Sequence, residues 1–459
     1  MKEKLADFKD IKGIIYNSVK NYATNIAFRI KEKIGKEITY KDVTYEKMLQ
    51  DINEFGTGLY LKGLKGKRIA IIGKNRYEWV LTYLTTLLGD MVAVPLDKEL
   101  QYDELENSLI RSKAECIVFD QKLRDSINEI KKNGKTSLKH FLCMDSGIES
   151  FESVQEIMSM GEDSIAKGNN EYINEDVDEN KMSVLLFTSG TTSKSKAVML
   201  SERNIASNIY AMMQVEDIRA TDTNIAFLPF HHIFGSTCIL VMLSGGVKTV
   251  FPDGLKYIKQ NLKEYEVTLF VGVPVLVEAM HKAVMKEIEK QGKTKLIKVA
   301  TKISDALLKC KMDIRRKLFK QVIDGLGGKL RMIIEGGAAA DPAISKSFNS
   351  LGILVVQGYG LTETAPVIAA ENPNELRLGS VGKAMCNDTL EIVEKDANGI
   401  GQIRVKGPNV MLGYYEMPEE TQKVLKDGWF YTGDLGYMDK DGYFYISGRD
   451  KNVIVLKNG

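Results

Sequence analysis

The sequence contains few of the residues that build disulfide frameworks and metal clusters. Among its 459 residues there are five cysteines and four histidines. The cysteines are far apart and form no CxxC motif: they are Cys116, Cys143, Cys238, Cys310 and Cys386. This spacing argues against a disulfide scaffold and against a cysteine-rich zinc site, and it suits a reducing cytoplasm. The four histidines likewise argue against a His-rich metal centre.

Long apolar runs and an excess of one charge are also missing. No stretch approaches the roughly 18 uncharged apolar residues that a membrane span needs, and the N-terminal sequence MKEKLADFKDIKG has no signal-peptide core. We therefore expect a cytoplasmic protein. Lys and Arg number 63 and Asp and Glu 61, for a net charge of +2. This balance gives no overall argument for a nucleic-acid partner.

One segment departs from that balance. Residues 281–331 carry fifteen Lys or Arg against five Asp or Glu. A solvated helical face is the simpler interpretation. The functional alternative is attraction to an anionic membrane surface, such as the inner membrane face, or to a phosphorylated ligand. No aromatic residues alternate with these charges, so nucleic-acid binding is not expected.

The chain as a whole alternates short apolar strands with helices. A parallel βαβ unit is predicted near the N-terminal end of the chain. It consists of the strand RIAIIG, a helix with one apolar face over 76–90, and the strand MVAVP. Similar strands recur at 115–119, 223–227, 247–251 and 267–271. We expect an α/β fold with helices on both faces of parallel-rich sheets. After residue 380, short strands separated by Gly and Asp turns predict a smaller antiparallel, barrel-like subdomain.

The expected organisation has four parts, with residues 171–180 as an acidic surface linker. They are an α/β subdomain at 1–180, an α/β subdomain with the nucleotide and acyl site at 181–379, the antiparallel subdomain at 380–447 and a hinge region at 448–459.

Residues 184–200, VLLFTSGTTSKSKAVML, predict two strands joined by a loop of small and hydroxyl residues. Such a loop can surround phosphate oxygens with N–H and O–H donors. It is not the P-loop of kinases and GTPases, because Ser195 and Ala197 stand where that motif needs Gly and Ser/Thr. A polar surface hairpin is the alternative.

Two further strands, 330–334 and 353–357, are predicted to end in glycine-rich turns at one sheet edge. Asp341-Pro342 favours a helix start between them. Ligands of open α/β sheets bind outside the carboxyl ends of strands, and Thr362 and Glu363 follow with groups suited to a Mg²⁺–phosphate ligand. A nucleoside triphosphate site is favoured. The alternative is that the glycines only allow tight packing.

Several motifs, taken in order, resemble the adenylate-forming superfamily. They are FTSGTTSKSKAVMLS, EGGAAADP, QGYGLTETAP and YTGDLGYMDKDGYFYISGRDKNVIV. Within that superfamily, FVGVPVLVEAMHKA and GGKLRMIIEGGAAADPAISKSFNSLGI are most similar to long-chain fatty acid–CoA ligases.

The resemblance implies roles for individual residues. The phosphate-binding residues would be Thr188, Ser189, Gly190, Thr191, Thr192 and Lys196. The nucleotide would lie against Gly336, Gly337, Ala338, Gly358, Tyr359 and Gly360, with Tyr359 stacking on the base. Thr362 would touch the α-phosphate and Glu363 would hold Mg²⁺. Asp434 and Arg449 would bind the ribose, a role that suits a carboxylate accepting two hydrogen bonds.

The acyl site is implied in the same way. Its walls would be His232, Gly235, Val271, Gly272, Val273, Pro274 and Gly336, with the catalytic group completed by Lys196, His232, Thr362 and Glu363. Ile233 and Phe234 follow the histidines, so there is no acid to pair with a substrate amine. Since an unpaired buried ammonium is costly, we do not expect an amino-acid substrate.

The sequence departs from the family pattern in three places. Ser193, Ser195 and Ala197 replace Gly, Pro and Gly of the usual phosphate loop, and Glu202 stands where many relatives have His. Lys451 matches the hinge position, but the family's C-terminal domain and its catalytic lysine have no counterpart in this sequence. We therefore expect the chain by itself to be poorly active.

The resemblance implies a ligase that uses ATP, Mg²⁺ and CoA. A fatty carboxylate would attack the α-phosphorus of ATP, pyrophosphate would leave, and a thiol would then displace AMP. A ligase that transfers the acyl group to a carrier protein, and a non-catalytic nucleotide- or acyl-binding module, remain as alternatives. Acyl chain length and oligomeric state stay open.

Overall fold

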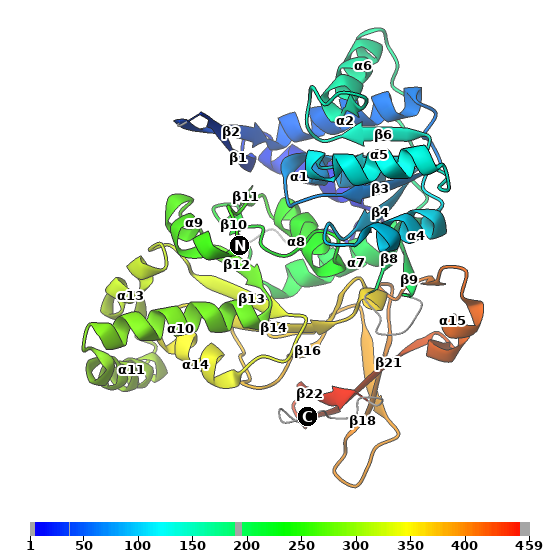
Figure 1. Cartoon of the computed structure of the whole chain (residues 1–459). Coiled ribbons are helices and arrows are strands. Elements are labelled where there is room, and N and C mark those ends of the chain that lie inside the picture. Colours follow the sequence, from blue (N-terminus) through cyan, green and yellow to red (C-terminus); the bar gives the residue numbers. More distant parts are fainter. Residues whose placement is uncertain (1–4, 36, 189–194, 450–459) are drawn as a thin grey trace.

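The computed structural model describes residues 5–35, 37–188 and 195–449 and contains three sheets (Figure 1). Two are large and mostly parallel, and the third is antiparallel. The α/β class and the antiparallel subdomain expected from the sequence are confirmed. The part of the chain described contains no helix long and apolar enough to cross a membrane, and its five cysteines form no disulfide.

Sheet A has nine strands, and its central strands from β14 to β1 are parallel. In spatial order they are β16 (Lys383–Ala384), β15 (Val367–Ala370), β14 (Leu354–Gly360), β13 (Met332–Gly336), β12 (Leu269–Gly272), β10 (Thr223–Ile225), β11 (Lys248–Val250), β1 (Ile26–Ile34) and β2 (Glu37–Thr44).

Sheet B has eight strands, parallel from β8 to β7. In order they are β19 (Gly413–Tyr414), β9 (Ala197–Ser201), β8 (Met182–Phe187), β4 (Val92–Leu96), β3 (Arg68–Ile72), β5 (Cys116–Phe119), β6 (His140–Cys143) and β7 (Glu152–Ser153). Sheet C is antiparallel and consists of β17 (Thr389–Val393), β18 (Gly401–Lys406), β20 (Leu425–Lys426), β21 (Trp429–Met438) and β22 (Phe444–Arg449).

Helices fill the space between sheets A and B and cover their outer faces (Figure 1). Between the sheets pack α1 (Ile11–Tyr22), α2 (Tyr45–Leu61), α3 (Tyr77–Leu88), α7 (Glu202–Val215) and α8 (Ile233–Ser244), with α6 (Val154–Ala166) against α2. Sheet B is covered outside by α4 (Tyr102–Ser112) and α5 (Arg124–Asn133). On the outer side of sheet A are α9 (Ile258–Glu264), α10 (Pro274–Lys290), α11 (Thr294–Lys309), α12 (Arg315–Leu318), α13 (Lys320–Gly325) and α14 (Pro342–Ser350); α15 (Pro418–Val424) follows β19.

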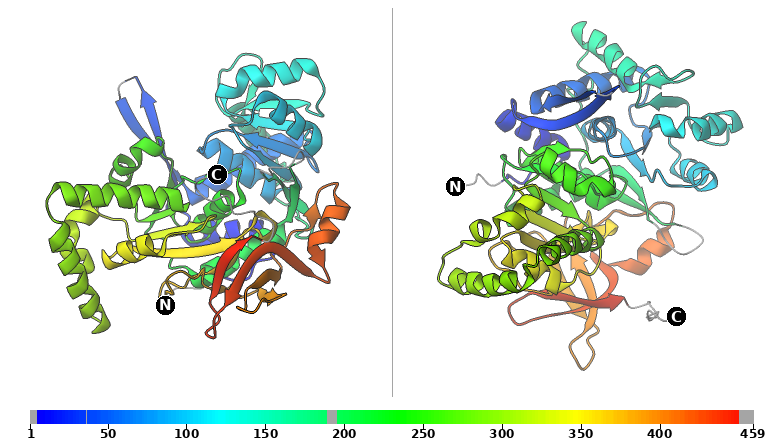
Figure 2. Two further views of the ribbon diagram at one scale, coloured as in Figure 1. Left: turned by 60° about the horizontal axis from the view of Figure 1, so that its bottom comes forward. Right: turned by 60° about the vertical axis from the view of Figure 1, so that its left-hand side comes forward.

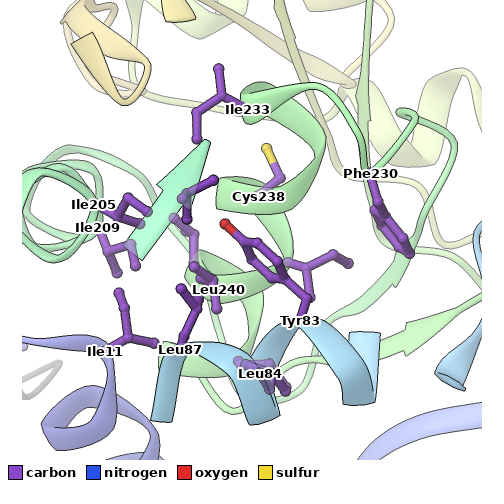
Figure 3. Packing of buried hydrophobic residues seen from close by; sticks show 14 of the residues in the cluster. Ile11, Tyr83, Leu84, Leu87, Ile205, Ile209, Phe230, Ile233, Cys238 and Leu240 are labelled. Carbon is purple, nitrogen blue, oxygen red and sulfur yellow. The ribbon is translucent and has the colours of Figure 1, made fainter. Parts of the chain in front are cut away.

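The strands alternate between two cores, as fully covered strands do. In β3, Ile69 and Ile71 face the core between the sheets, while Ala70 and Ile72 face the core under α4 and α5. Figure 3 shows the inner core close up, where Tyr83 and Leu87 of α3 meet α7 and α8. The predicted unit of β3, α3 and β4 is confirmed, with β3 and β4 paired in parallel.

The two large sheets take strands from both sides of residue 180. Strands β1 and β2 belong to sheet A, and β8 joins sheet B through the pair Ala93 and Val184. The segment 171–180 has neither helix nor strand, but it does not lie wholly on the surface. The ring of Tyr172 is buried where Gly56 and Gly89 leave room, and its hydroxyl donates to the Thr85 carbonyl at 2.8 Å. Tyr172 is the one buried residue of this segment; the other nine are exposed or half-buried, as a surface linker would be.

Candidate functional site

The carboxyl ends of β12, β13 and β14 meet at one edge of sheet A. Gly272 is in register with Glu335, and Gly336 with Gly358. The shared edge predicted from the sequence is therefore confirmed. Helix α14 starts where predicted, because the Asp341 carboxylate accepts the Ala343 N–H at 2.8 Å and Pro342 occupies the first helical position.

Glycines leave this edge as bare backbone beside a small cavity of about 50 Å³. Its lining includes Gly336, Gly337, Gly358, Tyr359 and Gly360 together with Phe234, Met212 and Val367. A Cβ on Gly336 would come within 3.0 Å of the Gly358 carbonyl and 3.4 Å of the Phe234 ring. Gly337 adopts φ +82°, which disfavours any side chain. Ala338 lies in the same exposed turn.

The residues expected to bind the base and the ribose touch each other across two sheets. The Tyr359 hydroxyl donates to Asp434 Oδ2 at 2.6 Å, and Arg449 Nε donates to Oδ1 at 2.8 Å. Figure 2 (left) shows sheet C, in red, beside the strands of sheet A. Burial and the neighbouring carboxylate raise the pKa of Tyr359, so its hydroxyl stays protonated. Each carboxylate oxygen retains a second lone pair for an incoming hydroxyl.

The expected Mg²⁺ ligand and phosphate lysine are joined by a tyrosine that the sequence analysis did not find. The Tyr414 hydroxyl donates to Glu363 Oε1 at 2.8 Å, and Lys196 Nζ lies 4.5 Å from the centre of the Tyr414 ring. Lys196 Nζ also lies 3.1 Å from Glu420 Oε2, in an ion pair of which each side chain is about one-third exposed. No motif indicated Tyr414 or Glu420, because only folding brings β19 and α15 to this place.

Thr188 and Lys196 pair at the two ends of the hydroxyl-rich segment. The Thr188 N–H donates to the Lys196 carbonyl at 2.8 Å. Arg111 fixes the adjoining residue, donating to Ser195 Oγ at 2.9 Å and to its carbonyl at 2.7 Å. The two strands predicted on either side of this loop are confirmed as β8 and β9, which pair antiparallel. Ser189, Gly190, Thr191 and Thr192 lie outside the described residues, as does Lys451.

The two histidines lie at the start of α8 with ring centres 4.2 Å apart. Burial lowers the pKa of His232, and burial together with His232 lowers that of His231 to about 4. His231 lies 3.5 Å from Asp97, which opposes this shift only in part. Both rings are therefore neutral at pH 7.

The small residues expected in the acyl wall have different surroundings. A Cβ on Gly235 would meet the Pro229 carbonyl at 2.2 Å, and one on Gly272 would meet the Phe270 ring at 2.6 Å. Both positions serve close packing, and neither lines the cavity at Gly336. Val271 is buried at the end of β12, and Val273 and Pro274 begin α10. The side chain that reaches the cavity from α8 is Phe234.

Two buried carboxyls lie behind the glycine edge and were not singled out from the sequence. Glu335 Oε1 accepts from Ser345 Oγ at 2.9 Å, and Glu371 accepts the backbone N–H groups of Gln357 and Arg377, each at 3.1 Å. Burial raises the pKa of Glu335 and raises that of Glu371 to about 7. The described residues contain no group of three or more His, Cys, Asp or Glu able to hold a metal ion.

A family profile described as AMP-binding enzyme matches residues 17–415. The chain belongs to the AMP-binding enzyme family. Similar proteins include a chloroplastic long-chain-fatty-acid–[acyl-carrier-protein] ligase, AEE15, of Arabidopsis thaliana, 28% identical over 93% of this chain and 70% of that protein. Human long-chain-fatty-acid–CoA ligase 1 is 30% identical over 92% of this chain and 64% of that protein. The family member described here thus spans about two thirds of the length of these relatives.

Solved structures share the fold of this AMP-binding enzyme. The N-terminal domain of FACL13 from Mycobacterium tuberculosis superimposes with a TM-score of 0.74 at 20% identity, covering 96% of this chain and 100% of that chain. FadD1 of Archaeoglobus fulgidus, a long-chain-fatty-acid–CoA ligase, gives 0.78 at 20% identity, covering 97% and 85%. The resemblance to the adenylate-forming superfamily and the fold it implied are confirmed.

Proposed function

We propose that this chain activates a long-chain fatty acid with ATP. The fatty carboxylate attacks the α-phosphorus, the bond to the bridging oxygen breaks, and pyrophosphate leaves with those electrons, giving acyl-AMP. A thiol then attacks the acyl carbonyl and AMP departs as the leaving group. The observation that carries this proposal is the contact of Tyr359 with Asp434 at the glycine edge, within a family whose relatives named above act on fatty acids.

The chain's own residues supply positioning and charge for this reaction. The exposed backbone of the neighbouring residues Gly336 and Gly358 would receive the base. The remaining lone pairs of the Asp434 carboxylate would accept hydrogen bonds from the ribose hydroxyls. Lys196 is held by a partly exposed ion pair with Glu420, which is weak, and by its contact with the Tyr414 ring. It can therefore exchange Glu420 for a phosphate oxygen, beside the N–H and O–H donors of the hydroxyl-rich segment and Thr362.

Glu363 fits Mg²⁺ because its second carboxylate oxygen is not used by Tyr414. Mg²⁺ commonly binds one or two carboxylates together with substrate phosphates, and Glu363 would supply one of them. When bound, the ion would neutralise phosphate charge. The orientation of Glu363 is then set by the hydroxyl of Tyr414.

His232 and Phe234 would receive the fatty acid. The imidazole is neutral, so it can hydrogen-bond a carboxylate without adding charge to it. The cavity beside Phe234 is lined by apolar side chains such as Met212 and Val367 and by the two acids Glu216 and Glu335. Its volume of about 50 Å³ would receive only the part of the acyl chain next to the carboxylate.

Fatty-acid-dependent exchange of pyrophosphate into ATP tests this proposal. We expect exchange with long-chain fatty acids and little with acetate, aromatic acids or amino acids. Absence of exchange with every acid, while ATP still binds, would favour a non-catalytic binding module instead.

The acceptor would be the thiol of CoA. A carrier-protein thiol is the second candidate, because the Arabidopsis relative is named as an acyl-carrier-protein ligase. Supplying CoA or phosphopantetheinylated carrier protein separately, and measuring thioester formed, separates the two.

We also propose that α11 contacts an anionic membrane surface. Val299 and Ile303 on its outer face are 56% and 53% exposed, and Lys298 and Lys302 lie beside them in the sequence. An apolar ridge flanked by lysines is typical of interfacial helices. Sedimentation with phosphatidylglycerol vesicles, but not with phosphatidylcholine vesicles, is expected, and the Ile303→Glu variant should lose it.

A further inference from the structure

A second cavity among the described residues is larger than the one at the glycine edge. It is a groove of about 630 Å³ between α9, α10, α11 and α13. Its floor consists of apolar side chains, including Leu262, Met280, Val284, Ile288 and Phe319. Leu255, Leu296 and Leu318 at its border are 61%, 64% and 44% exposed. This much uncovered apolar surface in a concave site is typical of a ligand-binding groove.

The groove is separate from the cavity at Gly336. Its floor belongs to the core on the outer side of sheet A, with Ile333 of β13, whereas Ile334 faces the inner core and lines the other cavity. The two cavities share no lining residue. A molecule in the groove would therefore lie on the opposite face of sheet A from the proposed active site (Figures 1 and 2).

The charges around the groove select an anion. Five lysines line it, against a single acid, Glu287: they are Lys256, Lys259, Lys293, Lys317 and Lys320. Lys320 is paired with Asp324 at 2.7 Å, and Lys293 donates to Gln321 at 2.6 Å. Lys317 has no side-chain partner among residues 5–35, 37–188 and 195–449. An apolar floor with a basic border is complementary to an alkyl chain that ends in an anionic group.

We infer that this groove is a second binding site for a long-chain carboxylate, with the alkyl chain on Met280, Val284 and Ile288 and the head group at Lys259 and Lys317. Its volume falls in the range of about 300–1,000 Å³ of small-molecule sites, which favours one chain over a protein partner. The choice of a carboxylate rests on the proposed function, since that is the amphiphile the enzyme would encounter.

A long-chain fatty acid carrying a photoreactive diazirine at its methyl end tests the site on the whole chain, without vesicles. Cross-linked peptides are expected from 279–291 and 317–326 as well as from the active site. Excess acyl-sulfamoyl adenosine, a stable acyl-adenylate analogue, should abolish labelling at the active site only. Labelling of 279–291 that disappears with the analogue, or that requires added anionic vesicles, would overturn the inference.

Two substitutions sharpen the test. Ala283 lines the groove and is exposed, so Ala283→Trp should fill it and reduce groove labelling about tenfold. The matched control is Lys282→Trp, next to it on α10 but outside the lining. Unchanged labelling in Ala283→Trp would contradict the site.

The head group is tested by Lys259→Glu/Lys317→Glu. This variant should weaken groove labelling by the carboxylate about tenfold and leave labelling by the corresponding uncharged alcohol unchanged. An equal loss for both probes would overturn the assignment of the head group. Pyrophosphate exchange by the unmodified protein reports the proposed function separately. Exchange without groove labelling removes only the second site, and groove labelling without exchange removes only the enzymatic proposal.

Discussion

At the scale of single residues, Tyr414 is the side chain on which the proposed phosphate site depends most. It hydrogen-bonds Glu363 and lies beneath Lys196. Tyr414→Phe keeps the ring and removes only a hydrogen bond to a carboxylate, worth about 1.5–3 kcal/mol. We expect fatty-acid-dependent pyrophosphate exchange to fall at least about tenfold, while the melting temperature falls by only a few degrees.

Tyr415→Phe is the matched control for that change. Tyr415 is the next residue, and its hydroxyl bonds Arg68 at 2.8 Å, away from Glu363. Equal exchange rates in Tyr414→Phe and the unmodified protein would remove Tyr414 from the site.

Asp434 gives a second prediction at this scale. Asp434→Asn keeps the shape of the side chain but replaces one acceptor oxygen by a donor and leaves Arg449 without its carboxylate partner. We expect AMP and ATP to bind about tenfold more weakly by calorimetric titration. Asp441→Asn, an exposed acid of the turn between β21 and β22 that pairs with Arg377, should bind both nucleotides normally. Undiminished AMP binding by Asp434→Asn would contradict the ribose role.

A site residue could be predicted from the sequence when it stands in a recognisable motif. It could not when its role depends on a partner that is distant in the sequence. Tyr359 and Asp434 stand in recognisable motifs, so the sequence singled out both. Tyr414 lies 51 residues from Glu363 in a segment without a motif, and its role exists only because β19 pairs with β9. The acyl-wall roles of Gly235 and Gly272 stay predictions, because sequence shows that a residue is small but not whether a ligand or a neighbouring group occupies the space.

At the scale of elements, local patterns predicted strands and helix starts well, and α7 carries one feature that they did not reveal. Glu202, in its first turn, is fully buried, and one carboxylate oxygen accepts the Ile11 N–H at 2.8 Å. The helix N-terminus favours the anion, but burial wins and raises the pKa of Glu202 to about 8. The folded protein therefore keeps a proton on this carboxyl that the unfolded chain releases near its ordinary pKa of 4.5.

Stability should consequently fall as the pH rises from about 5 to about 8. Glu202→Gln removes this titration, so its stability relative to the unmodified protein should increase steadily across the same range. Urea unfolding at several pH values measures the difference. Glu46→Gln, an exposed acid in the first turn of α2, is the control and should leave the pH dependence as it is. Parallel curves for Glu202→Gln and the unmodified protein would show that Glu202 is ionised in the folded state.

At the scale of the whole molecule, the sequence indicated which strands form but not which sheet each joins. Strand β1 pairs with β11 through Phe28 and Thr249, and β4 with β8 across residue 180. Such pairings are set by the closure of long loops and by the shared core, which no local pattern encodes. The inner core joins Ile69 of sheet B to Ile334 of sheet A through the helices between them.

This exchange of strands predicts how the protein behaves when it is divided. A fragment of residues 1–178 would leave β1 and β2 without sheet A and would expose the inner faces of α1 and α3, so we expect it to be unfolded or aggregated alone. Co-produced with residues 179–459, it should purify as a stable pair, because β4 and β8 then complete sheet B. Circular dichroism and size-exclusion chromatography of the separate and combined fragments measure this. A monomeric, cooperatively melting 1–178 fragment would show instead that the first 178 residues form an independent domain, with the strand pairs across residue 180 added afterwards.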